Sequence, residues 1–182
     1  MYFFDYEEHM FIFDGIRKLF KGDLQTTKND INESFKKNNL LAESQNYFVY
    51  NIYETVILVL KTPIISTTGK IFKRAKIIKK VYIGDFYGDP DCAAIASDES
   101  FCVMGGCGLI VYYLRKPFEK YIYDRHTDQW KELFREPENV WWIDELEVRG
   151  NSTILFTVDK ADPVNGGKYE LDVATMNIQK CS

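Results

Sequence analysis

The chain has 182 residues, of which 46% are hydrophobic and 15% aromatic, and it carries a formal net charge of −4. A chain of this length and composition buries enough apolar surface to fold without a metal ion or a disulfide, which excludes an intrinsically disordered protein. We therefore expect one folded domain over residues 1–182, with no cofactor and no bound metal.

The sequence carries neither an export signal nor a membrane span that we can identify. Its first nine residues include three acids where a secretory signal has basic residues. The longest apolar run, residues 55–60, is far shorter than the roughly 20 residues that cross a bilayer. We therefore expect a cytoplasmic protein that does not contact a membrane.

Its cysteines form no CxxC pair and no zinc spacing, so we expect them to be reduced and buried: Cys92, Cys102, Cys107 and Cys181.

Helical spacing dominates the first quarter of the chain. Apolar residues over 9–20 recur at near-helical intervals, and Gly22 with Asp23 forms a stop signal. A second helix is predicted after capping residues 27–30, with a partial apolar stripe that reaches Leu40 and Leu41. We expect residues 1–45 to form a helical N-terminal layer and residues 46–182 a β-rich body.

From Tyr47 onward the sequence favours strands, because β-branched and aromatic residues dominate. Residues 47–53 and 55–60 predict two strands around Glu54, whereas the pattern over 70–82 also fits a helix and is left open. Further strands, separated by turns rich in Gly, Pro, Asn, Asp and Ser, are predicted at 93–96, 101–104, 109–114, 120–123, 140–143, 145–148, 153–158 and 168–173. The expected fold is α+β but mainly β: an antiparallel meander of short strands, partly a propeller-blade-like curved sheet, with one or two N-terminal helices.

Charge is strongly segregated along the chain. Between Gly84 and Leu114 five carboxylates occur without a Lys or Arg, directly after the basic block that runs from Lys70 to Lys80. An acidic surface steers a basic partner, and aromatic side chains ringed by acids suit a protein interface. Because the whole chain is acidic, the basic block is interpreted as a solvated face, and no direct nucleic-acid binding is expected. The predicted partner-binding residues are Asp85, Tyr87, Asp89, Asp91, Asp98, Glu99, Trp141, Trp142, Asp144 and Glu145.

Other chemical interpretations of the sequence remain as alternatives. Cys107 lies between glycines and His126 follows further on, which is the minimal set for a cysteine-dependent enzyme, although such glycines equally describe a close backbone approach. Asp85, Asp89 and Asp91 lack the ordered spacing and the closing Glu of a calcium loop. A non-catalytic scaffold or regulatory binding module is a further alternative. Neighbouring Trp141 and Trp142 are expected to point to opposite faces of one strand, so at least one should be in the core.

One stretch resembles a known family. The run Tyr82-Ile-Gly-Asp-Phe-Tyr-Gly-Asp-Pro-Asp, continuing through 94–99 and 101–112, is similar to segments of small bacterial immunity proteins of contact-dependent growth inhibition and related polymorphic toxin systems. The resemblance covers residues 80–178. It implies a non-enzymatic cytoplasmic protein that binds a cognate toxin domain, often a nuclease, and blocks its active site. Such a toxin would be basic, because a nuclease presents Lys and Arg to phosphates.

Overall fold

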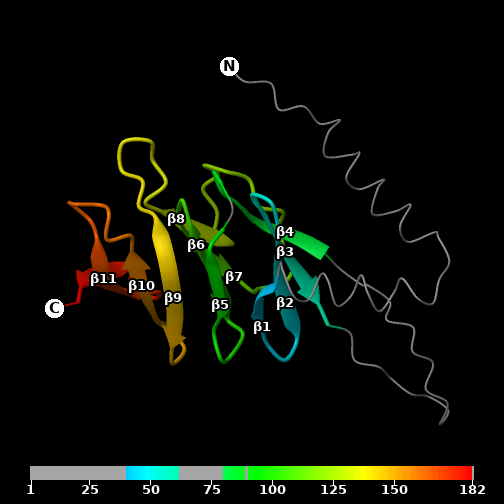
Figure 1. Cartoon of the computed structure of the whole chain (residues 1–182). Helices are drawn as coiled ribbons and strands as arrows, with labels where there is room; N and C mark the ends of the chain where they lie inside the picture. The colour runs from blue at the N-terminus through cyan, green and yellow to red at the C-terminus, as the bar shows by residue number, and fades with distance from the viewer. Residues whose placement is uncertain (1–39, 62–79, 89, 182) are drawn as a thin grey trace, which may run out of the picture. The chain divides into compact units, whose positions relative to one another are not determined.

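The computed structural model describes residues 40–61, 80–88 and 90–181, which all belong to one compact unit spanning Leu40–Ser182. These residues form twelve strands and no helix, arranged as three antiparallel sheets of four strands (Figure 1). Each sheet is a meander, because strands that are neighbours in the chain are also neighbours in the sheet. A membrane-spanning helix is thus not found in this described part of the chain.

The three sheets follow one another along the sequence. The first contains β1 (Leu40–Glu43), β2 (Tyr47–Ile52), β3 (Thr55–Leu60) and β4 (Lys80–Asp85). The second contains β5 (Cys92–Ile95), β6 (Phe101–Gly106), β7 (Gly108–Tyr113) and β8 (Trp130–Leu133). The third contains β9 (Ile143–Arg149), β10 (Thr153–Val158), β11 (Gly167–Asp172) and β12 (Asn177–Lys180).

The predicted β-rich body is confirmed, with three corrections to its elements. Residues 1–39 of the predicted helical layer lie outside the described residues, but Leu40–Glu43 is a strand rather than the end of a helix, because it pairs with β2. The strand predicted at 120–123 is wrong, since this segment is irregular and ends in a turn. The strand predicted at 145–148 lies within β9, whereas the strand predicted at 140–143 is wrong, because residues 140–142 precede β9 and only Trp142 makes an isolated bridge.

The sheets pack face to face in chain order, and the middle sheet is buried on both faces. Side chains such as Leu58 and Met104 fill the core between the first and second sheets. Val111 and Phe156 belong to the core between the second and third sheets. Every residue of β6 is buried, which explains its unbroken apolar sequence.

The first strands of the three sheets lie side by side, since β5 contacts both β1 and β9. The consequence for function is that the turns and loops of all three sheets gather at two opposite ends of the unit.

Candidate protein-binding surface

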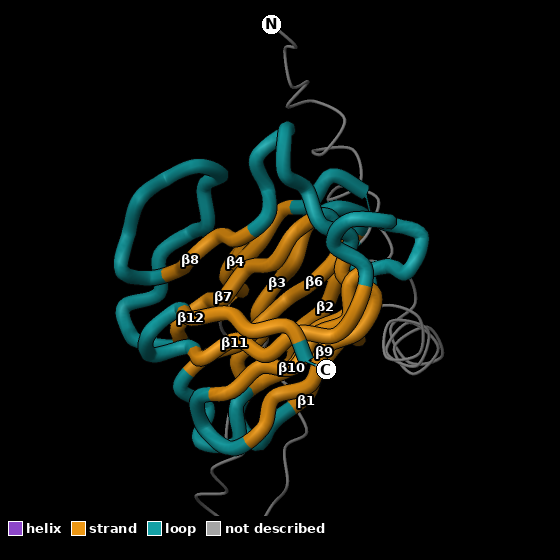
Figure 2. Tube along the Cα trace, turned by 90° about the vertical axis from the view of Figure 1, so that its left-hand side faces the viewer, coloured by secondary structure: helices purple, strands orange, loops and turns teal. Residues whose placement is uncertain are grey.

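The two ends of the strands differ in their connections, and we name them after Ser97 and Cys107. The Ser97 end holds the short turns that join β1 to β2, β5 to β6 and β9 to β10, at the bottom of Figure 1. The Cys107 end holds the turn at 53–54, the segments 86–88 and 90–91, Cys107 itself, and the connections 134–142 and 159–166. Figure 2 shows long connections as teal loops above the strands.

Backbone contacts join the connections of the Cys107 end to one another. Cys107 forms an isolated bridge with Trp142, whose carbonyl accepts a hydrogen bond from the Asp159 N–H at 2.9 Å. The Phe86 N–H donates to the Glu54 carbonyl at 2.8 Å. The Arg135 side chain, in the 134–142 connection, donates to the Asp85 carbonyl at the end of β4 at 2.6 Å. Connections of all three sheets are therefore joined by contacts at this end.

Large hydrophobic side chains are exposed on this surface. Tyr87 is 81% exposed and Trp142 48% exposed. Tyr123 belongs to the same end, because its hydroxyl donates to the Arg135 carbonyl at 3.4 Å. The described part of the chain has six exposed large hydrophobic residues, of which five lie at the Cys107 end and the sixth, Ile122, directly precedes Tyr123. We call them the apolar anchors: Tyr53, Tyr87, Ile122, Tyr123, Trp142 and Val164. Single exposed apolar residues are ordinary, whereas a group gathered on one end indicates an interaction surface.

Carboxylates crowd the same end at the start of β9. Burial, and then the charges of Asp91 and Asp144, raise the pKa of the Cys92 thiol to about 12. Partial burial, and then the charges of Asp159 and Glu145, raise the pKa of Asp144 above its usual value. The Cys92 thiol donates to the Ile143 carbonyl at 3.8 Å, and the Asp159 N–H donates to the Trp142 carbonyl at 2.9 Å, so the acids next to these contacts meet at the start of β9. We call them the acidic cluster: Asp91, Asp144, Glu145 and Asp159. A cation supplied by a partner would relieve the repulsion.

The described residues contain no group of three or more His, Cys, Asp or Glu side chains arranged to hold a metal ion. The acidic cluster is therefore considered below as a charged surface.

The structure divides the predicted partner-binding residues between the two ends. Asp89 lies outside the described residues. Asp98 and Glu99 lie in the turn between β5 and β6, at the Ser97 end, so the structure does not bring them together with the others. The residues that it places at the Cys107 end are Asp85, Tyr87, Asp91, Trp141, Trp142, Asp144 and Glu145.

Trp141 and Trp142 precede β9 and do not lie on one strand as expected, but their environments differ. Trp141 stacks on Phe134 with ring centroids 3.8 Å apart and packs against the second core. Its indole Nε1 donates to the Asn139 side-chain oxygen at 2.9 Å. Trp141 thus holds the 134–142 connection in place, and Trp142 is the tryptophan available to a partner.

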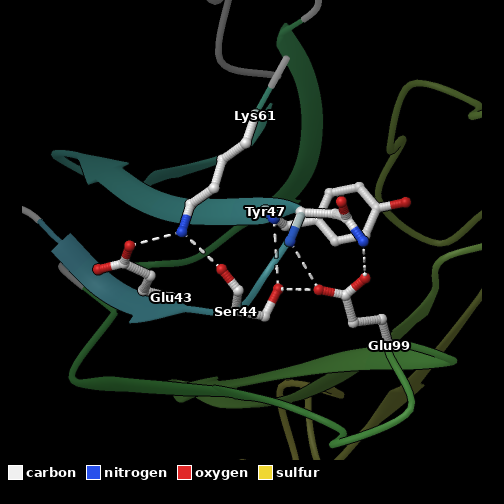
Figure 3. Close-up of polar contacts among 6 residues, drawn as sticks. Glu43, Ser44, Tyr47, Lys61 and Glu99 are labelled. Carbon is white, nitrogen blue, oxygen red and sulfur yellow. Dashed lines mark hydrogen bonds and ion pairs between the residues drawn. The ribbon is translucent and has the colours of Figure 1, made fainter. Parts of the chain in front are cut away.

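Glu99 ties two turns of the Ser97 end together (Figure 3). Its carboxylate accepts hydrogen bonds from the Ser44 hydroxyl at 2.6 Å, the Asn46 N–H at 2.8 Å and the Asn46 side-chain amide at 2.7 Å. Partial burial alone raises the pKa of Glu99, but these hydrogen bonds, with Lys61 nearby, outweigh it and hold the pKa below its usual value. Its carboxylate is therefore engaged within the fold.

Asp98 is likewise engaged within its own turn. Its carboxylate accepts hydrogen bonds from the Ser100 hydroxyl at 2.6 Å and the Ser100 N–H at 3.0 Å. These bonds lower the pKa of Asp98. The carboxylates of Asp98 and Glu99 are thus both hydrogen-bonded within the fold, at the opposite end from the apolar anchors.

Replacing Glu99 is expected to reduce stability in a pH-dependent way. Glu99→Ala should lower the free energy of unfolding at pH 7 by about 1–3 kcal/mol, since it removes charge-assisted hydrogen bonds. Because the folded-state pKa is depressed, this stabilisation is present above the unfolded-state value of about 4.3 and is lost as the pH falls through the folded-state value. Urea unfolding at pH 7 and pH 3 measures the effect.

The exposed Glu138 provides the control for this prediction. Glu138→Ala should change stability by less than about 0.5 kcal/mol at either pH. If Glu99→Ala lowered the free energy of unfolding equally at pH 7 and pH 3, this result would contradict the role assigned to the ionised Glu99 carboxylate.

Cys107 and His126 are not joined by a hydrogen bond in the described part of the chain. Burial raises the pKa of the Cys107 thiol, and Arg135 offsets only part of that effect. His126 is exposed in the connection between β7 and β8. A thiol nucleophile requires a lowered pKa or an adjacent base, so this arrangement gives the enzymatic alternative no geometric support.

Several residues of the surface were not anticipated from sequence. Tyr53, Ile122, Tyr123 and Val164 lie in turns or loops of the structure. Tyr53, Ile122 and Tyr123 were placed in strands by the sequence patterns 47–53 and 120–123, which gave no sign of their exposure. Only Val164 carried a usable signal, because it is a large apolar residue between the turn formers Pro163 and Asn165. Asp159 carried no comparable signal, because its proximity to Asp144 arises from the pairing of β9 with β10.

No protein-family model matches the chain, and no curated protein matches it.

Proposed function

We propose that this chain is a cytoplasmic, non-catalytic immunity protein that binds a cognate toxin domain and neutralises it. The toxin is a basic nuclease, and the Cys107 end covers its active-site surface. The observation that carries the proposal is the gathering of the apolar anchors and the acidic cluster on the same end.

The two parts of this surface serve different steps of binding. A nuclease holds phosphates with Lys and Arg, and carboxylates such as Asp144 and Glu145 complement that charge and accelerate encounter. Exposed aromatic residues such as Tyr87 and Trp142 supply most of the affinity once they are buried, as aromatic side chains do at interface hot spots.

The combination also distinguishes a protein partner from a nucleic acid. Aromatic side chains alone can stack on bases, but nucleic-acid surfaces place cations around them to hold the backbone. Here Trp142 lies two residues before Asp144, and its carbonyl accepts a hydrogen bond from the Asp159 N–H, so acids that repel phosphates lie close to it. The remaining alternative is a scaffold or regulatory module, which would lack one tight, dedicated partner.

Rescue of cells from a toxic partner tests the proposal. The tagged chain captures proteins from its source cells, and bound protein is eluted by raising the salt concentration, which weakens exposed charge pairs. The captured protein is then expressed alone and together with this chain. The proposal predicts a basic protein that stops growth alone and does not stop growth with the chain present. A captured partner without toxicity, or toxicity that the chain does not relieve, would contradict it.

A further inference from the structure

A buried arginine lies beneath the loops of the Cys107 end. The Arg135 side chain is only 9% exposed. One terminal nitrogen of its guanidinium donates to the Asp85 carbonyl at 2.6 Å, and the other donates to the Cys107 carbonyl at 3.2 Å. Its Nε lies 3.5 Å from the Glu132 carboxylate, an ion-pair contact whose geometry does not make a hydrogen bond.

Aromatic rings complete the environment of this guanidinium. Its central carbon lies 4.8 Å from the Phe86 ring centroid and 5.4 Å from that of Tyr123. Glu132 links Arg135 to the segment 121–124, because the Glu132 carboxylate also accepts hydrogen bonds from the Tyr121 hydroxyl and from the Asp124 N–H, the latter at 3.0 Å.

Each segment that Arg135 contacts carries an apolar anchor. Tyr87 directly follows Phe86, and Tyr123 itself faces the guanidinium. Trp142 is bridged to Cys107, whose carbonyl Arg135 binds. A single side chain thus joins the segments after β4, between β6 and β7, and between β7 and β8.

Two local features allow Arg135 to reach this position. Gly108 has φ +91°, and a Cβ there would overlap the Arg135 Cγ, so only glycine leaves room for the arginine stem. Phe134 has φ 58°, which is unusual for a bulky residue and turns the chain immediately before Arg135. Local strain of this kind is characteristic of functional sites.

We infer that Arg135 is the positioning residue of the binding surface: its guanidinium holds Tyr87, Tyr123 and Trp142 in the arrangement that the toxin contacts. This inference rests on the proposed function. Arg135 acts through these neighbours and does not touch the partner, since it is buried beneath them. A lysine cannot replace it, because an ammonium lacks the planar fork that binds two carbonyls at once.

Arg135→Lys tests the inference, with Arg149→Lys as the matched control. Arg149 also lies 3.5 Å from a glutamate, Glu147, but it is 63% exposed. The probes are the captured toxin, measured by its dissociation rate and by the salt dependence of association, and amide hydrogen exchange of the free chain. Arg135→Gln is the second variant in case the lysine variant does not fold, because it buries no charge.

We expect Arg135→Lys to raise the dissociation rate by at least about 10-fold, since loss of preorganisation acts mainly on dissociation. The salt dependence of association should not change, because the charge is retained below the surface. Amides at 85–88, 107–108 and 121–124 should exchange faster, while those of β10 and β11 should not. Arg149→Lys should alter none of these quantities.

Two results would overturn the inference while leaving the proposed function intact. The first is that the toxin dissociates from Arg135→Lys and from Arg135→Gln at the same rate as from the wild type. The second is that amides of β10 and β11 exchange faster by as much as those near Arg135, which indicates general destabilisation. Absence of toxin binding by the wild-type chain would overturn the proposed function, and the inference with it.

Discussion

Trp142→Ala should weaken binding of the toxin by at least about 30-fold, the factor that corresponds to the roughly 2 kcal/mol threshold of an interface hot spot. Trp142 is the exposed aromatic residue closest in sequence to the acidic cluster, and half of its surface is free to be buried by a partner. The loss should appear in the dissociation rate, measured by surface binding kinetics.

The stability of the chain should change little in this variant. Trp142 is 48% exposed, so we expect a decrease of less than about 1 kcal/mol in the free energy of unfolding. Leu155→Ala serves as the control for the affinity measurement, because Leu155 lies away from the anchors. It pairs with Glu147 and Glu170 in the third sheet. Equal affinities of Trp142→Ala and the wild type would remove Trp142 from the interface.

Charge reversal in the acidic cluster is the second large effect that we expect. Asp144→Lys should slow association with the basic toxin by about 10-fold or more at low salt, because carboxylates at an interface mainly accelerate encounter. The difference from wild type should shrink as salt screens the exposed charges. Stopped-flow association at two ionic strengths measures both effects.

Asp128→Lys is the matched control, since it changes the net charge equally but lies beside the start of β8, at the Ser97 end. It should slow association far less than Asp144→Lys. The free chain should also tolerate Asp144→Lys, because desolvation, and then the charges of Asp159 and Glu145, raise the pKa of Asp144 and disfavour its ionised form. Equal slowing by the two reversals would mean that net charge, rather than the cluster, governs association.

Sequence patterns predicted β10 well, because one face of this strand is buried and the other is not. In β10 the buried residues Ile154, Phe156 and Val158 alternate with partly exposed ones, and this period of two matches the pleat of a strand. The predicted strand 153–158 has the observed bounds.

Strands at the edges of sheets were predicted poorly. The sequences of β1, Leu-Leu-Ala-Glu, and β8, Trp-Lys-Glu-Leu, contain good helix formers. Their strand conformation comes from pairing with β2 and β7, which a local pattern does not contain.

The candidate surface was predicted in chemistry but only partly in position. The predicted partner-binding role of the acids and aromatic residues stays a prediction, and seven of the predicted residues share the Cys107 end. Asp91 and Asp98 are close in sequence, yet β5 runs between them and places them at opposite ends. Arg135 was missed because its importance lies in the carbonyls of Asp85 and Cys107, which any residue type could provide.

Inhibition of the toxin's nuclease activity, measured at increasing concentrations of nucleic-acid substrate, tests the central claim most directly. If the Cys107 end covers the surface that binds phosphates, the chain and the substrate compete, and the concentration of chain needed for half inhibition rises in proportion to substrate. Full nuclease activity at saturating chain would contradict neutralisation. Inhibition that does not depend on substrate concentration would contradict coverage of the active site.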